Sequence, residues 1–107
     1  MNVKINFHQM ESSEAITAII KKKSNKLKKF FSATTDIEWF LEAKKDGHSA
    51  RALLDSKGYH INADAKTHDL YKAIDDVVSK LEVQIKKKVS KSKDHSNDKL
   101  AFEEDSE

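Results

Sequence analysis

Residues 67–90 read THDLYKAIDDVVSKLEVQIKKKVS, and the apolar residues among them recur at steps of three and four. This spacing predicts a helix with one apolar side, because an α-helix turns by about 100° per residue. The apolar side consists of Leu70, Tyr71, Ile74, Val77, Val78, Leu81, Ile85 and Val89. Asp69 in the first turn and a lysine run, residues 86–88, in the last turns also suit the helix dipole.

The opposite side of this predicted helix is dominated by lysine. Lys72, Lys86 and Lys87 point away from the apolar side, and Lys80 lies on its flank. Val83 lies near the centre of the same outward face, between lysines. A solvated surface explains most lysine-rich helix faces, but an exposed valine inside a basic strip is a hint of a contact surface.

Four half-buried strands are predicted from the alternation of apolar and polar residues. They cover residues 3–8, 36–43, 50–55 and 59–65. Asp46-Gly47 and Lys57-Gly58 are turn signals between the last three strands, which therefore form a meander.

A further amphipathic helix is predicted between the first two strands. Ser13 can cap its N-terminus, and the helix runs to about Phe31. Six lysines fall within residues 21–29 and repel one another, so a phosphate-facing role is more attractive than a solvated one. Ser24 falls on the apolar stripe, which predicts a weak point in the packing.

The predicted order is β-α-β-β-β-α, which makes this an α+β fold. Both helices must pack on one face of the four-stranded sheet, because neither can bury its apolar side otherwise. Their outward lysines would then form one basic surface, in a build similar to that of a double-stranded-RNA-binding domain.

Charge divides the chain of 107 residues, whose formal net charge is +2, into two parts. Residues 1–93 carry nineteen Lys and Arg against twelve Asp and Glu, whereas residues 94–107 carry one lysine against six acids. We therefore expect one basic domain over 1–93 and a flexible acidic tail over 94–107. The basic part suggests a polyanion partner, although an ordinary lysine-rich surface explains the same composition.

Several classes of function find no support in the sequence. There is no cysteine, no glycine-rich phosphate loop and no metal-ligand spacing among the five histidines, so we expect no catalytic, cofactor or metal site and no enzyme activity. Apolar runs are too short for a membrane span, and residues 1–9 lack the pattern of a signal peptide. A cytoplasmic protein is expected.

The remaining hypotheses are binding functions. Lysine point charges suffice to read RNA through shape and phosphate, whereas sequence-specific DNA reading favours arginine or asparagine, and Arg51 is the only arginine. The alternatives are a general double-stranded-RNA-binding module and a protein-binding stress regulator. The regulator would use the exposed sheet face around Phe40, Arg51 and Leu53.

Two segments resemble a known family. The run Asp69-Leu70-Tyr71-Lys72-Ala73-Ile74-Asp75 and the later Lys80-Leu81-Glu82-Val83-Gln84-Ile85 resemble the second helix of the ribosome hibernation promoting factor, or ribosome-associated inhibitor A-like, family. Gln9-Met10-Glu11 and Lys26-Leu27-Lys28-Lys29-Phe30 resemble its first helix, and the resemblance covers about residues 1–93.

The resemblance implies a translation inhibitor that binds rRNA in the decoding region of the small ribosomal subunit. It would lie across the A and P sites and exclude tRNA and mRNA in non-growing cells. The implied partners are rRNA, ribosomal proteins and a small ribosome-dimerising protein, and the free chain would be a monomer. The contact residues carried over by position are Lys22, Lys26, Lys29, Lys80, Lys86 and Lys87.

Two positions depart from the family pattern. Val83 stands where the family usually has arginine, which implies the loss of one phosphate contact. Ser24 stands where it usually has a large apolar residue, which implies a less stable fold. Two subgroups remain open: short members with little tail assist the pairing of ribosomes into inactive dimers, whereas inhibitor-type members favour inactive single ribosomes. The acidic ending resembles that of the inhibitor-type members, although it is short.

Overall fold

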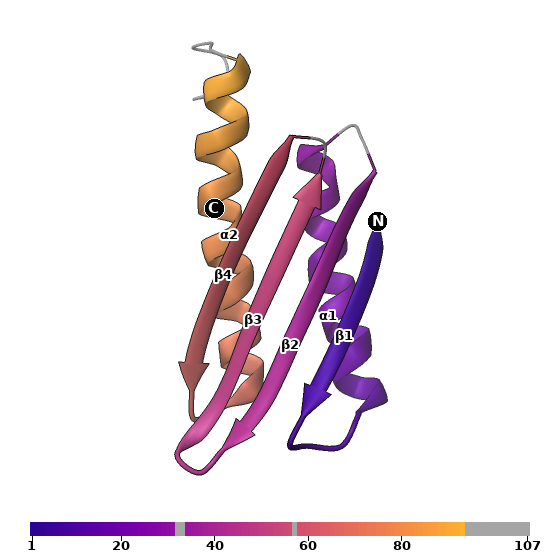
Figure 1. Ribbon diagram of the computed structural model, residues 1–107, viewed down its shortest axis with the longest axis vertical. Helices are drawn as coiled ribbons and strands as arrows, with labels where there is room; N and C mark the ends of the chain where they lie inside the picture. The colour runs from indigo at the N-terminus through magenta and orange to yellow at the C-terminus, as the bar shows by residue number, and fades with distance from the viewer. Residues whose placement is uncertain (32–33, 57, 94–107) are drawn as a thin grey trace.

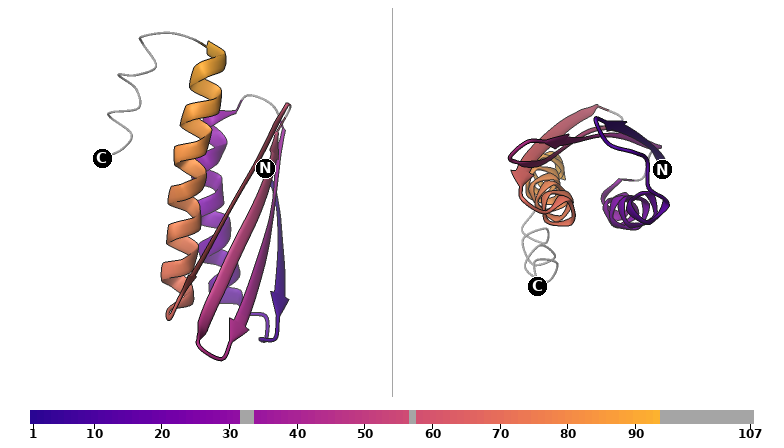
Figure 2. Two further views of the ribbon diagram at one scale, coloured as in Figure 1. Left: turned by 60° about the vertical axis from the view of Figure 1, so that its left-hand side comes forward. Right: turned by 90° about the horizontal axis from the view of Figure 1, so that it is seen from below.

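The computed structural model describes residues 1–31, 34–56 and 58–93, the last five of them as backbone only. Its elements are β1 (Asn2–His8), α1 (Glu14–Asn25), the 3₁₀ helix η1 (Lys26–Phe30), β2 (Thr35–Lys44), β3 (Gly47–Ser56), β4 (Tyr59–Thr67) and α2 (Leu70–Lys93). Both helices lie on one face of the sheet (Figure 1, Figure 2). The predicted α+β fold and its β-α-β-β-β-α order are confirmed. The predicted tail, 94–107, lies outside the described residues.

The strands follow one another across the sheet in the order β1-β2-β3-β4. β1 is parallel to β2, and the other two pairs are antiparallel. This arrangement follows from the connections, because a parallel pair needs a long crossover such as α1 and antiparallel pairs need only a turn. Ile37, Trp39 and Leu41 of β2 are buried under the helices, as their alternation predicts.

The β2–β3 hairpin turns one residue earlier than predicted. Its turn residues are Lys45 and Asp46, and Gly47 is already the first residue of β3. Gly47 has a φ of +151°, and a Cβ atom there would lie 2.8 Å from the carbonyl oxygen of Thr67 in β4. Glycine is required because the backbone of β4 passes too close for a side chain.

The first helix is shorter than predicted. It begins as expected, because the Ile16 amide donates to the Ser13 hydroxyl at 3.2 Å. It ends at Asn25, however, and the chain continues as η1 to Phe30. A 3₁₀ helix has three residues per turn, so this change keeps Leu27 and Phe30 on the same inward side. Leu27 is fully buried and Phe30 packs against the core.

Ser24 is not a weak point in the packing, so that prediction is wrong. Its side chain is fully buried, and its hydroxyl accepts a hydrogen bond of 3.0 Å from Trp39 Nε1. The indole N–H of the equally buried Trp39 needs such a partner, because a buried donor left unpaired is costly. The prediction failed because it treated Ser24 as a gap in an apolar stripe.

Helix α2 packs across β3 and β4, where small side chains let it approach the sheet. Ala50, Ala52 and Ala63 on these strands are buried. The buried side of α2 matches the prediction at Leu70, Ile74, Val77, Leu81 and Ile85. Tyr71 departs from it, because 45% of its surface is exposed. No helix in the described ranges is apolar over a length that could cross a membrane.

Candidate nucleic-acid interface

Helices α1 and α2 lie side by side and run in the same direction (Figure 1, Figure 2). An ion pair joins them, with Lys23 Nζ 2.6 Å from Asp75 Oδ1. The same direction places the C-terminal ends of both helices at one end of the molecule. Lysines gather in these last turns, where the helix dipole favours positive charge.

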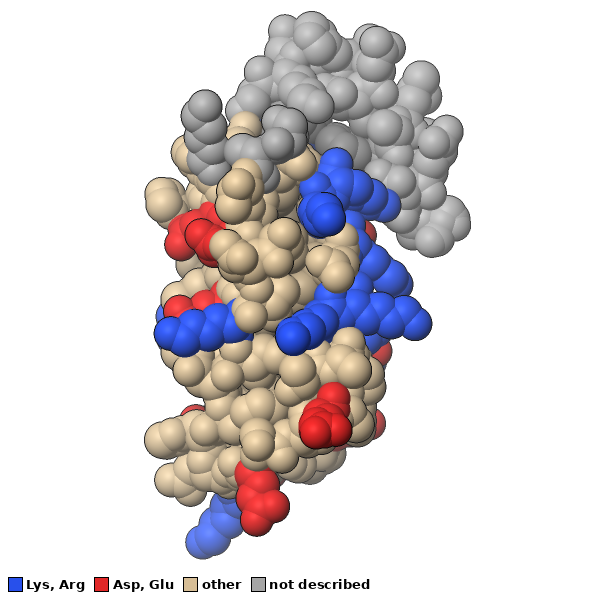
Figure 3. Space-filling model, turned by 90° about the vertical axis from the view of Figure 1, so that its right-hand side faces the viewer, with Lys and Arg blue, Asp and Glu red and all other residues tan. Residues whose placement is uncertain are grey.

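The last turns of α1, together with η1, form a lysine face that contains no acid. We use the name lysine face for Lys21, Lys22, Lys23, Lys26, Lys28 and Lys29, of which only Lys23 is half-buried and the rest are exposed. No Asp or Glu occurs between residues 15 and 35. Blue side chains accordingly gather toward the upper right of Figure 3. Lys29 Nζ also lies 5.3 Å from the centre of the Phe30 ring, within cation–π range.

A groove of about 330 Å³ separates the outer surfaces of the two helices. Ile19, Lys22 and Lys23 of α1 and Lys26 of η1 form one wall, and Tyr71 and Asp75 of α2 form the other. The residues on each wall are three or four positions apart, so each set shares one helix face. The Lys23–Asp75 ion pair crosses the groove and holds its walls together.

The lysines of α2 are less free to face a ligand than those of α1. Lys80 Nζ donates to the carbonyl oxygen of Asp64 at 2.7 Å, and Gln84 Nε2 donates to that of Asn62 at 2.6 Å. These bonds use outward carbonyls of β4 and so cover an edge strand that could otherwise pair with another chain. Lys72 lies 3.8 Å from Asp76 on the same helix.

The six predicted contact residues are only partly brought together. Lys22 and Lys26 share the groove, and Lys29 follows along η1. Lys80 lies at the β4 edge, on another flank of α2. Lys87 is exposed near the end of α2, and Lys86 beside it is half-buried.

Four of the six groove residues were not among the predicted contact residues, namely Ile19, Lys23, Tyr71 and Asp75. Lys23 was placed in the lysine cluster but not among the contact residues, although it stands four positions after Ile19. Tyr71 was placed in the buried stripe, because its spacing from Ile74 and Val78 fits a core position. Its place in the first turn of α2, at the margin of the stripe, was the available signal.

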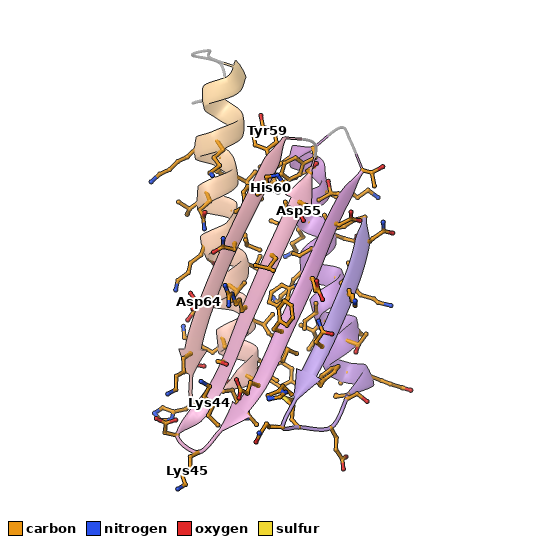
Figure 4. The ribbon with its side chains drawn as sticks, in the orientation of Figure 1. Lys44, Lys45, Asp55, Tyr59, His60 and Asp64 are labelled. Atoms are coloured by element: carbon orange, nitrogen blue, oxygen red, sulfur yellow. The ribbon has the colours of Figure 1, made fainter. Side chains whose placement is uncertain are left out.

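The opposite, uncovered face of the sheet carries charges of both signs. A row of directly paired positions crosses it from Asn6 through Phe40 and Arg51 to Asp64. Figure 4 shows this face, with Asp55 beside His60 near one end of the hairpin strands and Lys44 near the other. Such alternation is less suited to a polyanion than the lysine face of α1 and η1.

The electrostatics of the sheet side are those of local pairs. At the β2–β3 turn, Lys66 Nζ donates to Asp46 Oδ2 at 3.1 Å. This hydrogen bond lowers the pKa of Asp46 below its usual value. No cluster of three or more His, Cys, Asp or Glu placed to hold a metal occurs within the described ranges.

Known proteins share both the sequence pattern and the fold. A sequence model of the Sigma 54 modulation protein / S30EA ribosomal protein family matches residues 3–93. The ribosome hibernation promoting factor of Salmonella typhimurium is 32% identical over 95 residues, which cover 89% of this chain and all of that protein. The factor of the same name from Azotobacter vinelandii is 29% identical over 85 residues, or 79% of each chain.

Two solved structures superpose on this chain. The N-terminal domain of Thermus thermophilus Protein Y matches with a TM-score of 0.76 and 26% identity, covering 81% of this chain and 98% of that one. A ribosomal subunit interface protein from Coxiella burnetii matches with a TM-score of 0.75 and 25% identity, covering 84% and 99%. These matches confirm the resemblance seen in the two helices. The chain therefore belongs to the Sigma 54 modulation protein / S30EA ribosomal protein family.

Proposed function

We propose that this chain is a ribosome hibernation factor that binds rRNA in the decoding region of the small ribosomal subunit. Bound across the A and P sites, it excludes tRNA and mRNA in the cytoplasm of non-growing cells. Its relatives are named ribosome hibernation promoting factors, and a structural neighbour is named a ribosomal subunit interface protein. The observation that carries the proposal is the acid-free lysine face of α1 and η1.

The chemistry of this surface suits folded RNA. Lysine is a compact charge that pairs with phosphate without demanding a particular base, and RNA helices are recognised mainly through shape and phosphate. We propose phosphate contacts at Lys22, Lys26, Lys29, Lys80, Lys86 and Lys87. The mixed charges of the open sheet then face ribosomal proteins or solvent, because phosphate would be repelled by their acids.

The partners follow from this placement. The free chain is proposed to be a monomer, and the bound chain contacts rRNA and neighbouring ribosomal proteins. A small ribosome-dimerising protein acts on the same ribosomes from a separate position.

Competition with tRNA tests the proposal. Small subunits carrying mRNA and labelled tRNA are titrated with the chain, and retained tRNA is measured by filter binding. The wild-type chain should displace the tRNA at concentrations that saturate the subunit. The charge-reversal variant Lys22→Glu/Lys26→Glu should displace it at least tenfold less effectively, because both side chains are exposed on the lysine face.

The matched control is Lys4→Glu/Lys44→Glu, which makes the same change of charge on the sheet side. Both of these lysines are exposed, and they pair with Glu38 and Glu42 at 3.8 and 4.0 Å. This variant should compete like the wild type. If tRNA stays bound to subunits saturated with wild-type chain, the proposed exclusion is wrong.

A further inference from the structure

Tyr71 is a large aromatic side chain on the surface of the basic side of the molecule. Exposed large hydrophobic residues in the described part of the chain are Phe40, Tyr71 and Val83. Of these, Tyr71 lines the groove between the helices. Its backbone N–H donates to Asp69 Oδ1 at 3.0 Å. This hydrogen bond stabilises the first turn of α2 and so fixes the backbone from which the Tyr71 side chain projects.

The groove around Tyr71 combines an apolar wall with positive charge. Ile19 is half-buried opposite the tyrosine, while Lys22 and Lys26 are exposed along the same wall. Asp75 does not cancel these charges, because Lys23 already neutralises it at 2.6 Å. Within the described ranges, no hydrogen bond engages the Tyr71 hydroxyl, so the ring can serve a ligand.

We propose that the groove holds one unpaired nucleotide of an RNA strand, with its base stacked on Tyr71 and its phosphates at Lys22 and Lys26. This inference rests on the proposed RNA-binding function and names the nucleotide-binding residue within it. The volume of about 330 Å³ lies at the lower end of the range of small-ligand pockets, which suits a single nucleotide.

The aromatic ring distinguishes an unpaired nucleotide from other polyanions. In a duplex the faces of the bases are covered by their neighbours, so the tyrosine could reach only the backbone. An acidic peptide would satisfy the lysines but would leave the aromatic ring without a stacking partner. A single-stranded nucleotide satisfies both parts of the groove, as in other proteins that combine a basic channel with aromatic platforms.

The test uses the full chain and a fluorescently labelled single-stranded RNA hexamer, with binding measured by anisotropy at low salt. Tyr71→Leu should weaken binding by about 5- to 150-fold, the range that loss of one base–aromatic stack gives. Tyr71→Phe keeps the ring and should bind within twofold of the wild type. Phe40→Leu, a matched change on the opposite sheet face, should have no effect.

Three further probes separate stacking from charge. An abasic hexamer keeps the phosphates but has no bases, so the wild type and Tyr71→Leu should bind it equally. An acidic peptide of equal charge should bind both chains equally and more weakly than the RNA. A free nucleoside monophosphate should compete only at concentrations far above those of the hexamer.

The proposal is overturned if Tyr71→Leu binds the RNA hexamer like the wild type. It is also overturned if the substitution weakens binding of the abasic hexamer by the same factor as binding of the RNA hexamer. A free nucleotide that binds as tightly as the hexamer would overturn the assignment to an RNA strand. The contact between the base and Tyr71 can also be tested without any substitution. A 4-thiouridine hexamer is cross-linked to the wild-type chain, and the cross-linked peptides are identified by mass spectrometry. The hexamer should mark the Tyr71 peptide, and cross-links confined to other peptides contradict the proposal.

Failure of the groove proposal can be distinguished from failure of the proposed ribosome-binding function. If the groove proposal alone fails, Tyr71→Leu still displaces tRNA from the small subunit while Lys22→Glu/Lys26→Glu does not. If the proposed function fails, the wild-type chain does not displace tRNA, whatever the hexamer shows.

Discussion

The Ser24 hydroxyl joins helix α1 to strand β2 inside the core, through the hydrogen bond from Trp39 Nε1. Ser24→Ala would leave the indole N–H buried and unpaired, so we predict a loss of about 1–3 kcal/mol in the free energy of unfolding. Urea denaturation measures it. Ser79→Ala, on the exposed side of α2, should change the same quantity by less than about 0.5 kcal/mol. Equal effects of the two substitutions would contradict this role of Ser24.

Val83 is 53% exposed on α2, as the sequence predicted. Because it stands in the basic strip of that helix, Val83→Arg should add one phosphate contact. We predict tighter binding to small ribosomal subunits and a salt dependence steeper by about one counterion. Phe40→Arg places the same charge on the open sheet face, where Phe40 is 39% exposed, and should change neither quantity. If Phe40→Arg tightened binding to small subunits and Val83→Arg did not, the sheet face and not the helix side would contact the RNA.

Individual residues show where sequence reasoning reaches its limit. The buried positions of β2 follow from alternation, because strand geometry alone decides which side chains face the helices. The roles of Ser24 and Tyr71 do not follow from spacing. Ser24 depends on a tryptophan fifteen positions away, and Tyr71 depends on how closely α1 approaches the first turn of α2.

At the scale of elements, helix α2 serves two purposes. Its inward side covers β3 and β4, and its flank covers the β4 edge through Lys80 and Gln84. Periodicity predicted the first purpose but not the second, because a side-chain bond to a strand carbonyl leaves no periodic pattern. The end of α1 at Asn25 was also beyond prediction, since apolar spacing barely distinguishes an α-helix from a 3₁₀ turn.

Because α2 also covers the β4 edge, the proposed lysine contacts should differ in how much they contribute to binding. Lys80 Nζ is engaged by the Asp64 carbonyl, whereas Lys22 is exposed in the groove. We predict that Lys22→Ala weakens binding to small subunits several-fold and that Lys80→Ala weakens it by less than twofold. Sedimentation with purified subunits measures both. A larger loss with Lys80→Ala would show that this lysine leaves the β4 edge to bind phosphate.

At the scale of the whole molecule, charge is divided between the helix side, the sheet side and residues 94–107. The helix side carries the lysine face, the sheet side carries mixed charges, and residues 94–107 carry one lysine against six acids. The sequence alone predicted the basic domain and the acidic ending. It could not show that Lys22, Lys23 and Lys26 line a groove, because that depends on the packing of two helices far apart in the chain.

The acidic ending is proposed to oppose the pairing of ribosomes, since phosphate around a bound chain repels it toward surfaces where two ribosomes meet. Cutting the chain after Lys93 should leave binding to single ribosomes within a few-fold of the intact protein. The same cut should let ribosome dimers accumulate when the dimerising protein is supplied, as seen by gradient sedimentation. Equal amounts of dimers with both forms would contradict this role.

The salt dependence of binding to purified small ribosomal subunits tests the central claim, that the lysine face meets ribosomal phosphate. The six proposed phosphate contacts, three on the lysine face and three on α2, predict a slope of about −4 to −5 in a plot of log affinity against log salt concentration. Lys22→Ala/Lys26→Ala should make this slope shallower by about two, and Lys4→Ala/Lys44→Ala on the sheet side should leave it unchanged. A flat plot for the wild type, or a slope altered only by the sheet-side variant, would contradict the account.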